Sequence, residues 1–308
     1  MNQWHILAPS KKLIFVHIIY RILNARQFFM LIRIPSLTAT AIPLLTGGAI
    51  AFRAGKFDIF LWADMFIVAL FMQIATNVFN EHGDYIHGID KFVSHGFSGV
   101  IVKGEASARE VLKIAMVFYL AAAILAIPLV VKRGSLVIVL GLLAASVGFL
   151  YSEGPLPLSN TPLGEVLVGL TMGLIEVIAT ELVASGKITA SGYFISVPIS
   201  LLVSAILIAN NIRDIQKDRQ VNRKTLIVLI GGRYATILFY SVIAFSYLWL
   251  PVIWIFTGNF FINLPIFTLP IAVWGAFYLH KNGWKYGVEI SSVLYLIYGL
   301  VLTLTLLI

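Results

Sequence analysis

The sequence predicts an all-α integral membrane protein, in which nine transmembrane helices form one bundle and the N-terminus is cytoplasmic. The first observation is composition: of 308 residues, 59% are hydrophobic and only 12% are charged, whereas a soluble domain is about 25% charged. The second is the recurrence of apolar segments of about 20 residues, the length a spanning helix needs. The third is a marked asymmetry of positive charge between alternate loops. These features exclude a soluble enzyme, a disordered chain and a nucleic-acid-binding domain.

The first 27 residues predict a helix that lies on the membrane surface. Apolar residues recur there at helical spacing beside several Lys, Arg and His residues, which is typical of a helix in the interface plane. No small-residue cleavage site is present, so we expect no cleavable signal peptide. Residues 1–308 are expected to form a single membrane domain, with residues 1–27 as its interfacial helix and lead-in.

Nine segments after this helix have the length and apolarity of a membrane span. They are residues 34–52, 59–79, 111–131, 135–151, 163–184, 193–211, 234–256, 261–280 and 287–308. Pro155 and Pro157 separate the fourth segment from the fifth, and glycines mark several other turns.

Positive charge orients these spans. With nine spans, the N-terminus and the 2–3, 4–5, 6–7 and 8–9 loops share one side, which carries 17 of the 22 Lys and Arg residues. Cytoplasmic loops are enriched in Lys and Arg, so this side is predicted to face the cytoplasm. A missed helix would scramble the asymmetry, which therefore also supports the count. We expect a multi-pass protein of the cell membrane whose functional loops face the cytoplasm.

Two acidic clusters fall on the predicted cytoplasmic side, and the first ends the second span. Asn77, Asn80 and Asp84 share a face if the helix continues, because side chains three or four positions apart lie together. Glycines that follow let the chain turn, so that Asp90 can fold back toward Asp84.

The second cluster ends the sixth span. Asn210, Asp214 and Asp218 occur every four residues along one helical stripe, where like charges repel each other unless a cation binds. Oxygen ligands in a chain with no cysteine indicate a hard ion such as Mg²⁺, which takes one or two carboxylates, waters and substrate phosphates. Two such clusters facing each other would clamp a diphosphate. A solvated loop face remains the alternative for either cluster alone, but two on one side disfavour it.

These residues resemble the motifs of a known family. Asn80-x3-Asp84 followed by Asp90, together with Asp214-x3-Asp218, is similar to the two Asp-rich motifs of the UbiA superfamily of intramembrane prenyltransferases. The resemblance is greater to its menaquinone-forming (1,4-dihydroxy-2-naphthoate prenyltransferase) branch. It covers roughly residues 30–230, and the second motif is its most specific part. After Asp90 the chain departs from the family pattern, because the usual Asp and Arg run is missing.

The resemblance implies transfer of an isoprenoid chain from a prenyl diphosphate, geranylgeranyl or longer, to an aromatic acceptor, with Mg²⁺ as the cofactor. The implied catalytic residues are Asp84, Asp90, Asp214, Asp218 and Tyr151. The implied metal ligands are Asp84, Asp90, Asp214, Asp218 and Asn80. The candidate substrate-binding residues are Asn77, Asn80, Asn210, Asn211, Arg213, Lys217, Arg219, Lys103, Glu165, His87 and Arg33. Arg223 and Lys224 are further candidates for phosphate contacts.

Other functions remain as alternatives. A 4-hydroxybenzoate-type ring or a glycerol-phosphate lipid alcohol could replace the naphthoate acceptor. A cation-coupled transporter is the alternative from another class, but transporters place their carboxylates near the bilayer midplane. Glu176, Glu181 and Glu289 also fall within or near spans, where an ionisable side chain is a functional candidate. For Glu176 and Glu181, we favour side chains that reach outward to the membrane surface.

Overall fold

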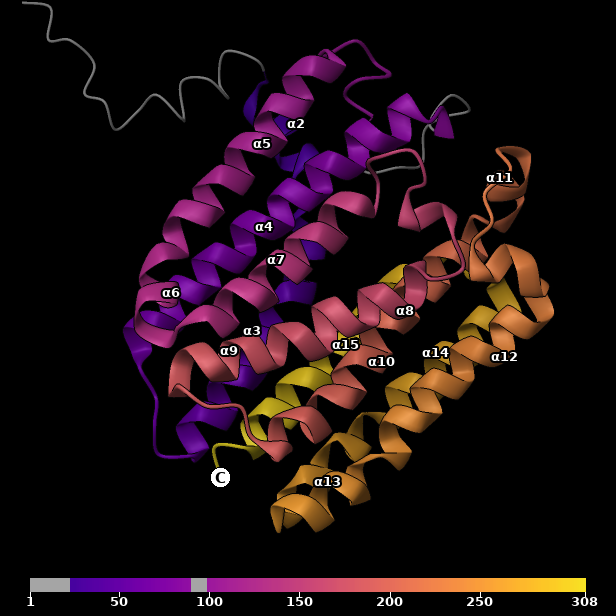
Figure 1. Cartoon of the computed structure of the whole chain (residues 1–308). Helices are drawn as coiled ribbons and strands as arrows, with labels where there is room; N and C mark the ends of the chain where they lie inside the picture. The colour runs from indigo at the N-terminus through magenta and orange to yellow at the C-terminus, as the bar shows by residue number, and fades with distance from the viewer. Residues whose placement is uncertain (1–22, 90–98) are drawn as a thin grey trace, which may run out of the picture.

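The computed structural model describes residues 23–89 and 99–308, and its regular elements there are all helical. The first half comprises α2 (Ala25–Leu31), α3 (Ile34–Arg53), α4 (Ile59–Ile86), α5 (Ala108–Leu125), α6 (Ile127–Arg133) and α7 (Ser135–Leu150) (Figure 1). The second half comprises η3 (Leu158–Asn160), α8 (Gly164–Gly169), η4 (Leu170–Ile175), α9 (Glu176–Ser185), α10 (Ala190–Arg213), α11 (Ile215–Gln220), α12 (Leu226–Leu248), α13 (Leu250–Thr257), η5 (Phe260–Thr268), α14 (Leu269–Asn282), η6 (Trp284–Tyr286) and α15 (Gly287–Thr305).

The chain is an integral membrane protein by the length and apolarity of its helices. Among the described residues, seven helical segments can each cross a membrane, and the bent pair α2–α3 makes an eighth if it counts as one span. The predicted span 135–151 is the helix α7, whose 16 residues are shorter than a full span. Nine spans and a cytoplasmic N-terminus therefore stay predictions. The interfacial helix falls mostly on residues 1–22, outside the described residues.

Helix starts are defined by polar caps that satisfy the first free N–H groups. Asp58 accepts from the backbone N–H of Phe60 and Leu61 at the start of α4, and Ser107 and Glu110 form a capping box at the start of α5. The α4 helix runs seven residues past its predicted end and stops before Gly88, which has a φ of 70°. Only glycine adopts this conformation without strain.

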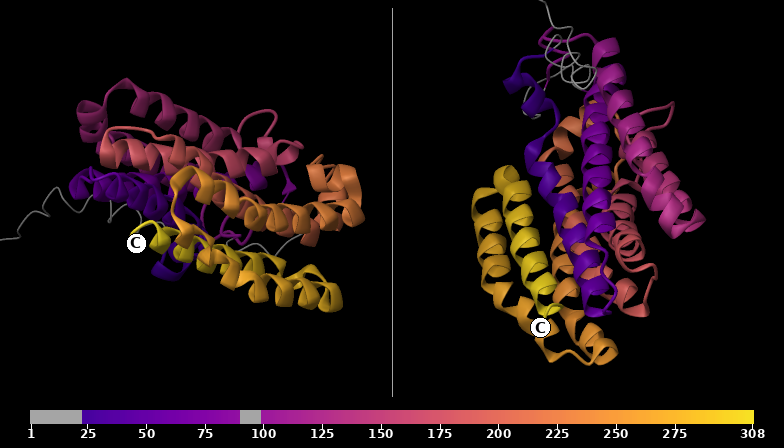
Figure 2. Two further views of the ribbon diagram at one scale, coloured as in Figure 1. Left: turned by 90° about the horizontal axis from the view of Figure 1, so that it is seen from below. Right: turned by 90° about the vertical axis from the view of Figure 1, so that its left-hand side faces the viewer.

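Two of the hydrophobic cores are formed by different sets of helices. Leu202 and Tyr295 belong to a core formed by α3, α9, α10, α13 and α15, whereas Phe79 and Phe118 belong to a core between α4 and α5. Figure 2 shows α12–α15 on one side of the bundle and α4–α7 on the other. The connections that follow α4, α7 and α10 all lie at one end of the bundle (Figure 1). This end is the one that the sequence predicts to be cytoplasmic.

Candidate active site

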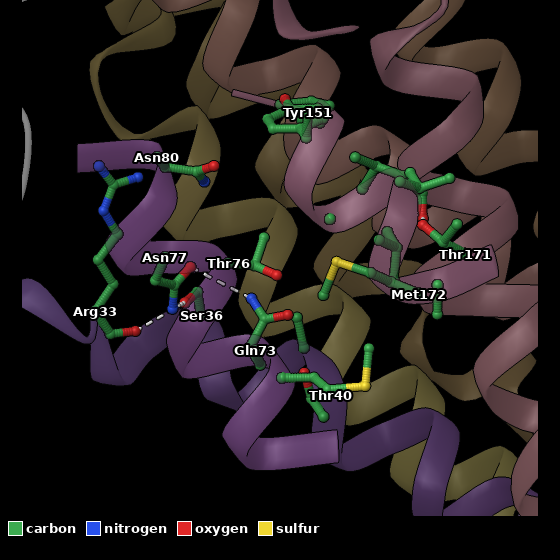
Figure 3. A pocket seen from close by; sticks show the side chains of 18 of the residues that line it. Arg33, Ser36, Thr40, Gln73, Thr76, Asn77, Asn80, Tyr151, Thr171 and Met172 are labelled. Atoms are coloured by element: carbon green, nitrogen blue, oxygen red, sulfur yellow. Dashed lines mark hydrogen bonds between the residues drawn. The ribbon is translucent and has the colours of Figure 1, made fainter. Parts of the chain in front are cut away.

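A cavity of about 1580 Å³ extends into the bundle from these connections. Its lining comes from α3, α4, α7, α9, α10 and α15. Figure 3 shows Arg33, Asn77 and Asn80 on one wall and Tyr151 across from them, with Met172 further in. The cavity therefore joins a polar end to a largely apolar interior.

The first acidic cluster is held in place by the turn that follows α7. Ser152 donates a hydrogen bond from its hydroxyl to Asn80 Oδ1. Two residues further along α4, His82 Nδ1 lies 2.7 Å from Glu153 Oε1, and both side chains are buried. A Cβ on Gly83 would overlap the Ser152 carbonyl oxygen, so only glycine allows this approach. These contacts fix the last turn of α4, which carries Asp84.

Asn77 braces this wall from within. Its Nδ2 donates to the Ile32 carbonyl oxygen and to Ser36 Oγ, both at 2.7 Å. Gln73 Nε2 donates to its Oδ1 at 3.4 Å. Asn77 is buried and lines the cavity, but its amide already ties α4 to the start of α3. Asn77 therefore braces this wall, and its predicted contact with substrate stays a prediction.

The second acidic cluster keeps its helical stripe although α10 ends at Arg213. Backbone hydrogen bonds from Asp214 to Asn210 at 3.0 Å and from Asp218 to Asp214 at 2.9 Å carry the four-residue pattern into α11. The Arg213 guanidinium donates to both Asp214 carboxylate oxygens, at 3.0 and 2.7 Å, and to Asn210 Oδ1 at 2.8 Å. Arg213 thus offsets the like charges that share this stripe.

Asp218 is the most buried carboxylate of the cluster, with only 1% of the residue exposed. Its Oδ1 accepts from Arg223 Nη1 at 3.1 Å, and its Oδ2 has no hydrogen-bond partner within the described part of the chain. Burial raises the pKa of the Asp218 carboxyl, and the positive charge of Arg223 opposes that rise. A buried carboxylate oxygen without a donor is suited to a cation.

The two clusters meet around Arg223. Asp84, Asp214 and Asp218 all line the cavity. Burial alone would lower the pKa of the Arg223 guanidinium, but the negative charges of Asp218 and Asp84 raise it overall. One cation therefore lies within electrostatic range of carboxylates from both motifs. Across residues 23–89 and 99–308, no group of three or more His, Asp or Glu side chains is arranged to hold a metal ion by itself.

Comparison with known proteins agrees with this arrangement. Residues 40–302 match the UbiA prenyltransferase family. The chain belongs to this family. A 1,4-dihydroxy-2-naphthoate octaprenyltransferase of Bacillus subtilis is 36% identical over 221 residues, which cover 72% of this chain and 71% of that protein. A UbiA prenyltransferase domain-containing protein 1 homolog of Drosophila melanogaster is 30% identical over 260 residues, which cover 81% of this chain and 70% of that protein.

Solved UbiA structures share the fold. An apo UbiA homolog from Aeropyrum pernix K1 has a TM-score of 0.67 at 18% identity and covers 87% of this chain and 97% of that one. A UbiA homolog from Archaeoglobus fulgidus bound to GPP and Mg²⁺ has a TM-score of 0.64 at 16% identity, with coverage of 90% and 99%. The family and the enzyme class predicted from the two Asp-rich motifs, a prenyltransferase, are confirmed.

Most of the predicted site residues of this UbiA-family chain line its cavity. Besides the aspartates and the residues in Figure 3, they include Lys103, Asn210, Asn211, Arg213 and Lys217. Asp90 lies outside the described residues. Arg33 lines the cavity with its Nη2 4.0 Å from Glu81 Oε2.

Three predicted substrate contacts do not line the cavity. Arg219 is exposed on α11. Glu165 lies behind the wall, where its Oε1 accepts from Asn211 Nδ2 at 2.8 Å, so this pair joins α8 to α10. His87 has its two ring nitrogens 2.8 Å from the Gly83 carbonyl oxygen and 3.0 Å from that of Gly154. In this structure Glu165 and His87 hold neighbouring parts of the site together, and their predicted contacts with substrate stay predictions.

Sequence reasoning missed other residues of the site. Ser152, Ser159 and Gln73 line the cavity, and Asn160 Oδ1 accepts from Arg223 Nε at 2.9 Å. No spacing rule indicates Ser152 or Asn160, because their partners Asn80 and Arg223 are far away along the chain. Tyr151 was indicated only by the resemblance to the family.

Proposed function

We propose that this UbiA-family prenyltransferase moves an isoprenoid chain from a prenyl diphosphate to an aromatic quinone precursor at the cytoplasmic face of the cell membrane. One observation carries the proposal: both acidic clusters line the polar end of a single cavity whose interior is apolar. A prenyl diphosphate has this same division, with a charged head and a long apolar tail. The positive-inside rule favours the cytoplasmic side for that polar end.

The polar end suits a diphosphate held with Mg²⁺. Asp84, Asp214 and Asp218, together with Asn80 and the predicted ligand Asp90, would supply oxygen ligands of the kind Mg²⁺ prefers. The unpartnered Oδ2 of Asp218 supports this fit. Mg²⁺ bound there would neutralise the diphosphate charge and improve it as a leaving group. The Archaeoglobus fulgidus homolog bound to GPP and Mg²⁺ supports this choice of ligand.

The cations of the site bind and orient the diphosphate head. Arg33, Lys103 and Lys217 line the same end of the cavity as the aspartates, and their charge favours phosphate oxygens. Arg213 is bonded to Asp214 and Asn210, so it mainly orients that carboxylate. The tail then extends into the apolar interior between α7 and α9.

Departure of the diphosphate leaves an allylic cation, which bulk water would capture. The packed helices around the cavity keep water away from it. Tyr151 lines the cavity within electrostatic range of Asp84 and Arg223. An aromatic ring at this place would stabilise a positive charge that forms beside the diphosphate.

We favour 1,4-dihydroxy-2-naphthoate as the acceptor, because the Bacillus subtilis relative at 36% identity is named for it. A 4-hydroxybenzoate-type ring is the nearest alternative. A glycerol-phosphate lipid alcohol is a second one, since a digeranylgeranylglyceryl phosphate synthase shares the fold at 15% identity and a TM-score of 0.64. Membership of the UbiA family argues against a transporter.

The test is product formation by the purified full chain in lipid nanodiscs. Geranylgeranyl and octaprenyl diphosphate are each supplied with Mg²⁺ and with the three acceptors, and products are identified by mass spectrometry. Asp84→Asn, Asp214→Asn and added EDTA should each abolish the product. Asp58→Asn is the matched control, because Asp58 only caps α4 at the other end of the bundle.

A prenylated dihydroxynaphthoate that disappears with EDTA and with both site variants supports the proposal. A product formed only with a different acceptor overturns the choice of acceptor, but it still supports Mg²⁺-dependent prenyl transfer. Absence of Mg²⁺-dependent consumption of either diphosphate contradicts the proposed activity.

A further inference from the structure

The interior of the cavity carries a group of polar side chains that an isoprenoid tail does not need. Thr40 of α3, Gln73 of α4, Glu176 of α9 and Tyr295 of α15 all line it. Figure 3 shows Thr40 and Gln73 further into the bundle than Asn80 and Tyr151. Gln73 and Tyr295 already donate to other groups of the protein, but a purely hydrocarbon ligand would leave the polar atoms of Thr40 and Glu176 facing an apolar chain, which is costly.

Glu176 reaches this group because the helix is altered just before it. The six residues Leu170–Ile175 form a π-helical turn between α8 and α9. Such a turn shifts the facing of the residues that follow and is frequent at functional sites. The structure therefore corrects our prediction that Glu176 reaches outward to the membrane surface, because its side chain lines the cavity. Ionisable residues at such depth face cavities and are functional candidates.

Thr40 supplies a second, independent observation. Only 1% of the residue is exposed, and its Oγ1 has no hydrogen-bond partner within the described part of the chain. Thr40 directly follows Ala39, whose carbonyl oxygen accepts from the Tyr295 hydroxyl of α15 at 2.7 Å. A buried hydroxyl without a partner is expensive. A bound ligand with a polar group would satisfy it.

The polar side chains around Glu176 lie at a depth in the cavity just beyond the expected place of the first carbon of the prenyl diphosphate. Glu289 of α15 lies within electrostatic range of Arg213, at the level of the second acidic cluster. Tyr295 is six residues further along α15, so it lies about 9 Å deeper, and Glu176 is its electrostatic neighbour. With the diphosphate head at the aspartates, as proposed above, the first carbon of the prenyl chain would lie between these two levels. A nucleophile that approaches this carbon from the side away from the leaving group comes from the level of Glu176.

We infer that Thr40 and Glu176 form a subsite for the hydroxyl group of a phenolic acceptor ring, with Gln73 and Tyr295 beside them. This inference rests on the proposed function and specifies where the acceptor binds. The Glu176 carboxyl accepts from the acceptor hydroxyl, and the Thr40 hydroxyl donates to its oxygen. The acceptor ring then lies between the polar end and the apolar interior of the cavity, and it faces the first carbon of the prenyl chain. A site that hydrogen-bonds a hydroxyl strongly rejects an analogue that lacks it.

The experiment compares two acceptors that differ by one hydroxyl, 1,4-dihydroxy-2-naphthoate and 1-hydroxy-2-naphthoate, at saturating geranylgeranyl diphosphate. The variants are Glu176→Ala, Glu176→Gln and Thr40→Val. Thr40→Val removes a hydroxyl that bonds nothing in the described structure, so the fold should tolerate it. Glu181→Gln is the matched control: Glu181 is on the same helix, its Oε1 accepts from the Thr189 N–H, and it does not line the cavity.

We expect the wild type to favour the dihydroxy acceptor at least ten-fold in kcat/KM. Glu176→Ala and Thr40→Val should raise the acceptor KM at least ten-fold and reduce that preference, Glu176→Gln should have an intermediate effect, and the donor KM should stay within two-fold. Glu181→Gln should match the wild type. Wild-type acceptor KM and preference in both Glu176→Ala and Thr40→Val would overturn the inference, as would a rise in the donor KM alone. A wild type that prenylates no aromatic acceptor would instead contradict the proposed function.

Discussion

Arg223 donates from Nη1 to Asp218 Oδ1 across 3.1 Å, and the same guanidinium is bonded to the connection between α7 and α8. Its Nε donates to Asn160 Oδ1 and its Nη2 to the Ser159 carbonyl oxygen, both at 2.9 Å. A single side chain thus holds a buried carboxylate of the second motif against the segment that carries Tyr151. Arg223 orients Asp218 for the cation that we propose there.

Replacing Arg223 should therefore weaken Mg²⁺ binding without removing any ligand. The substitution Arg223→Lys keeps the positive charge but loses the planar guanidinium that donates to three partners. Loss of groups that orient metal ligands costs about 10–100-fold in metal affinity or activity. We expect the Mg²⁺ concentration for half-maximal activity to rise within that range, as measured by Mg²⁺ titration of product formation.

The control for this prediction is Arg219→Lys, four residues earlier on the exposed side of α11. It should leave the Mg²⁺ dependence unchanged. An equal rise in both variants would show that general positive charge, and not the bonding of Arg223, determines metal affinity.

Local helical patterns explain why both acidic clusters were predicted from sequence. Asn80 and Asp84 follow a four-residue spacing, as do Asn210 and Asp214, and each pair stays within one helical run. Spacing of this kind depends only on helix geometry. Apolar segment length likewise indicated the membrane helices, since every predicted segment falls largely on helical residues.

Long-range contacts could not be predicted in this way. His82 meets Glu153 across 71 residues of sequence, and Arg223 meets Asn160 across 63. The inward facing of Glu176 depends on a π-helical turn, which no periodicity in the sequence marks. Arg219 was a candidate phosphate contact because it belongs to the charged second motif. It is exposed on α11 and does not line the cavity.

The buried pair of His82 and Glu153 should stabilise the end of α4. In His82→Ala, Glu153 Oε1 loses its partner in a buried position. Leaving such a group unsatisfied costs about 1–3 kcal/mol. We expect a matching loss of stability in thermal unfolding, together with lower activity because Asp84 lies on the same turn.

A double-mutant cycle separates the pair from each side chain alone. His82→Ala combined with Glu153→Ala should lose less stability than the two single changes added together, since removal of both partners leaves no orphaned group. Strict additivity of the two changes would contradict a direct stabilising contact.

Gly83 should be intolerant of even one methyl group. In Gly83→Ala the new Cβ meets the backbone and side chain of Ser152, so α4 must separate from the turn that positions Asn80. Overpacking of this kind costs about 1–3 kcal/mol. We expect lower thermal stability and a larger loss of kcat. Gly232→Ala is the control, because a Cβ there has open space; similar losses in both variants would refute the close approach as the cause.

The apolar part of the cavity should set the length of donor that the enzyme accepts. Gly141 of α7 lines this part, and a Cβ added there meets nothing within 4 Å. The Cβ of Gly141→Leu therefore enters open space and the longer side chain narrows this part of the cavity, while the helix gains from losing a glycine. We expect kcat/KM to fall more for octaprenyl diphosphate than for geranyl diphosphate, because only the longer tail extends to the filled region.

The measurement is kcat/KM across donors of increasing length with one acceptor and constant Mg²⁺. Val139→Leu is the matched control, since Val139 lies on the same helix, is 59% exposed and does not line the cavity. Its profile should follow the wild type. A uniform loss at every donor length in Gly141→Leu would mean that α7 positions the diphosphate head, and that the limit on tail length lies elsewhere in the bundle.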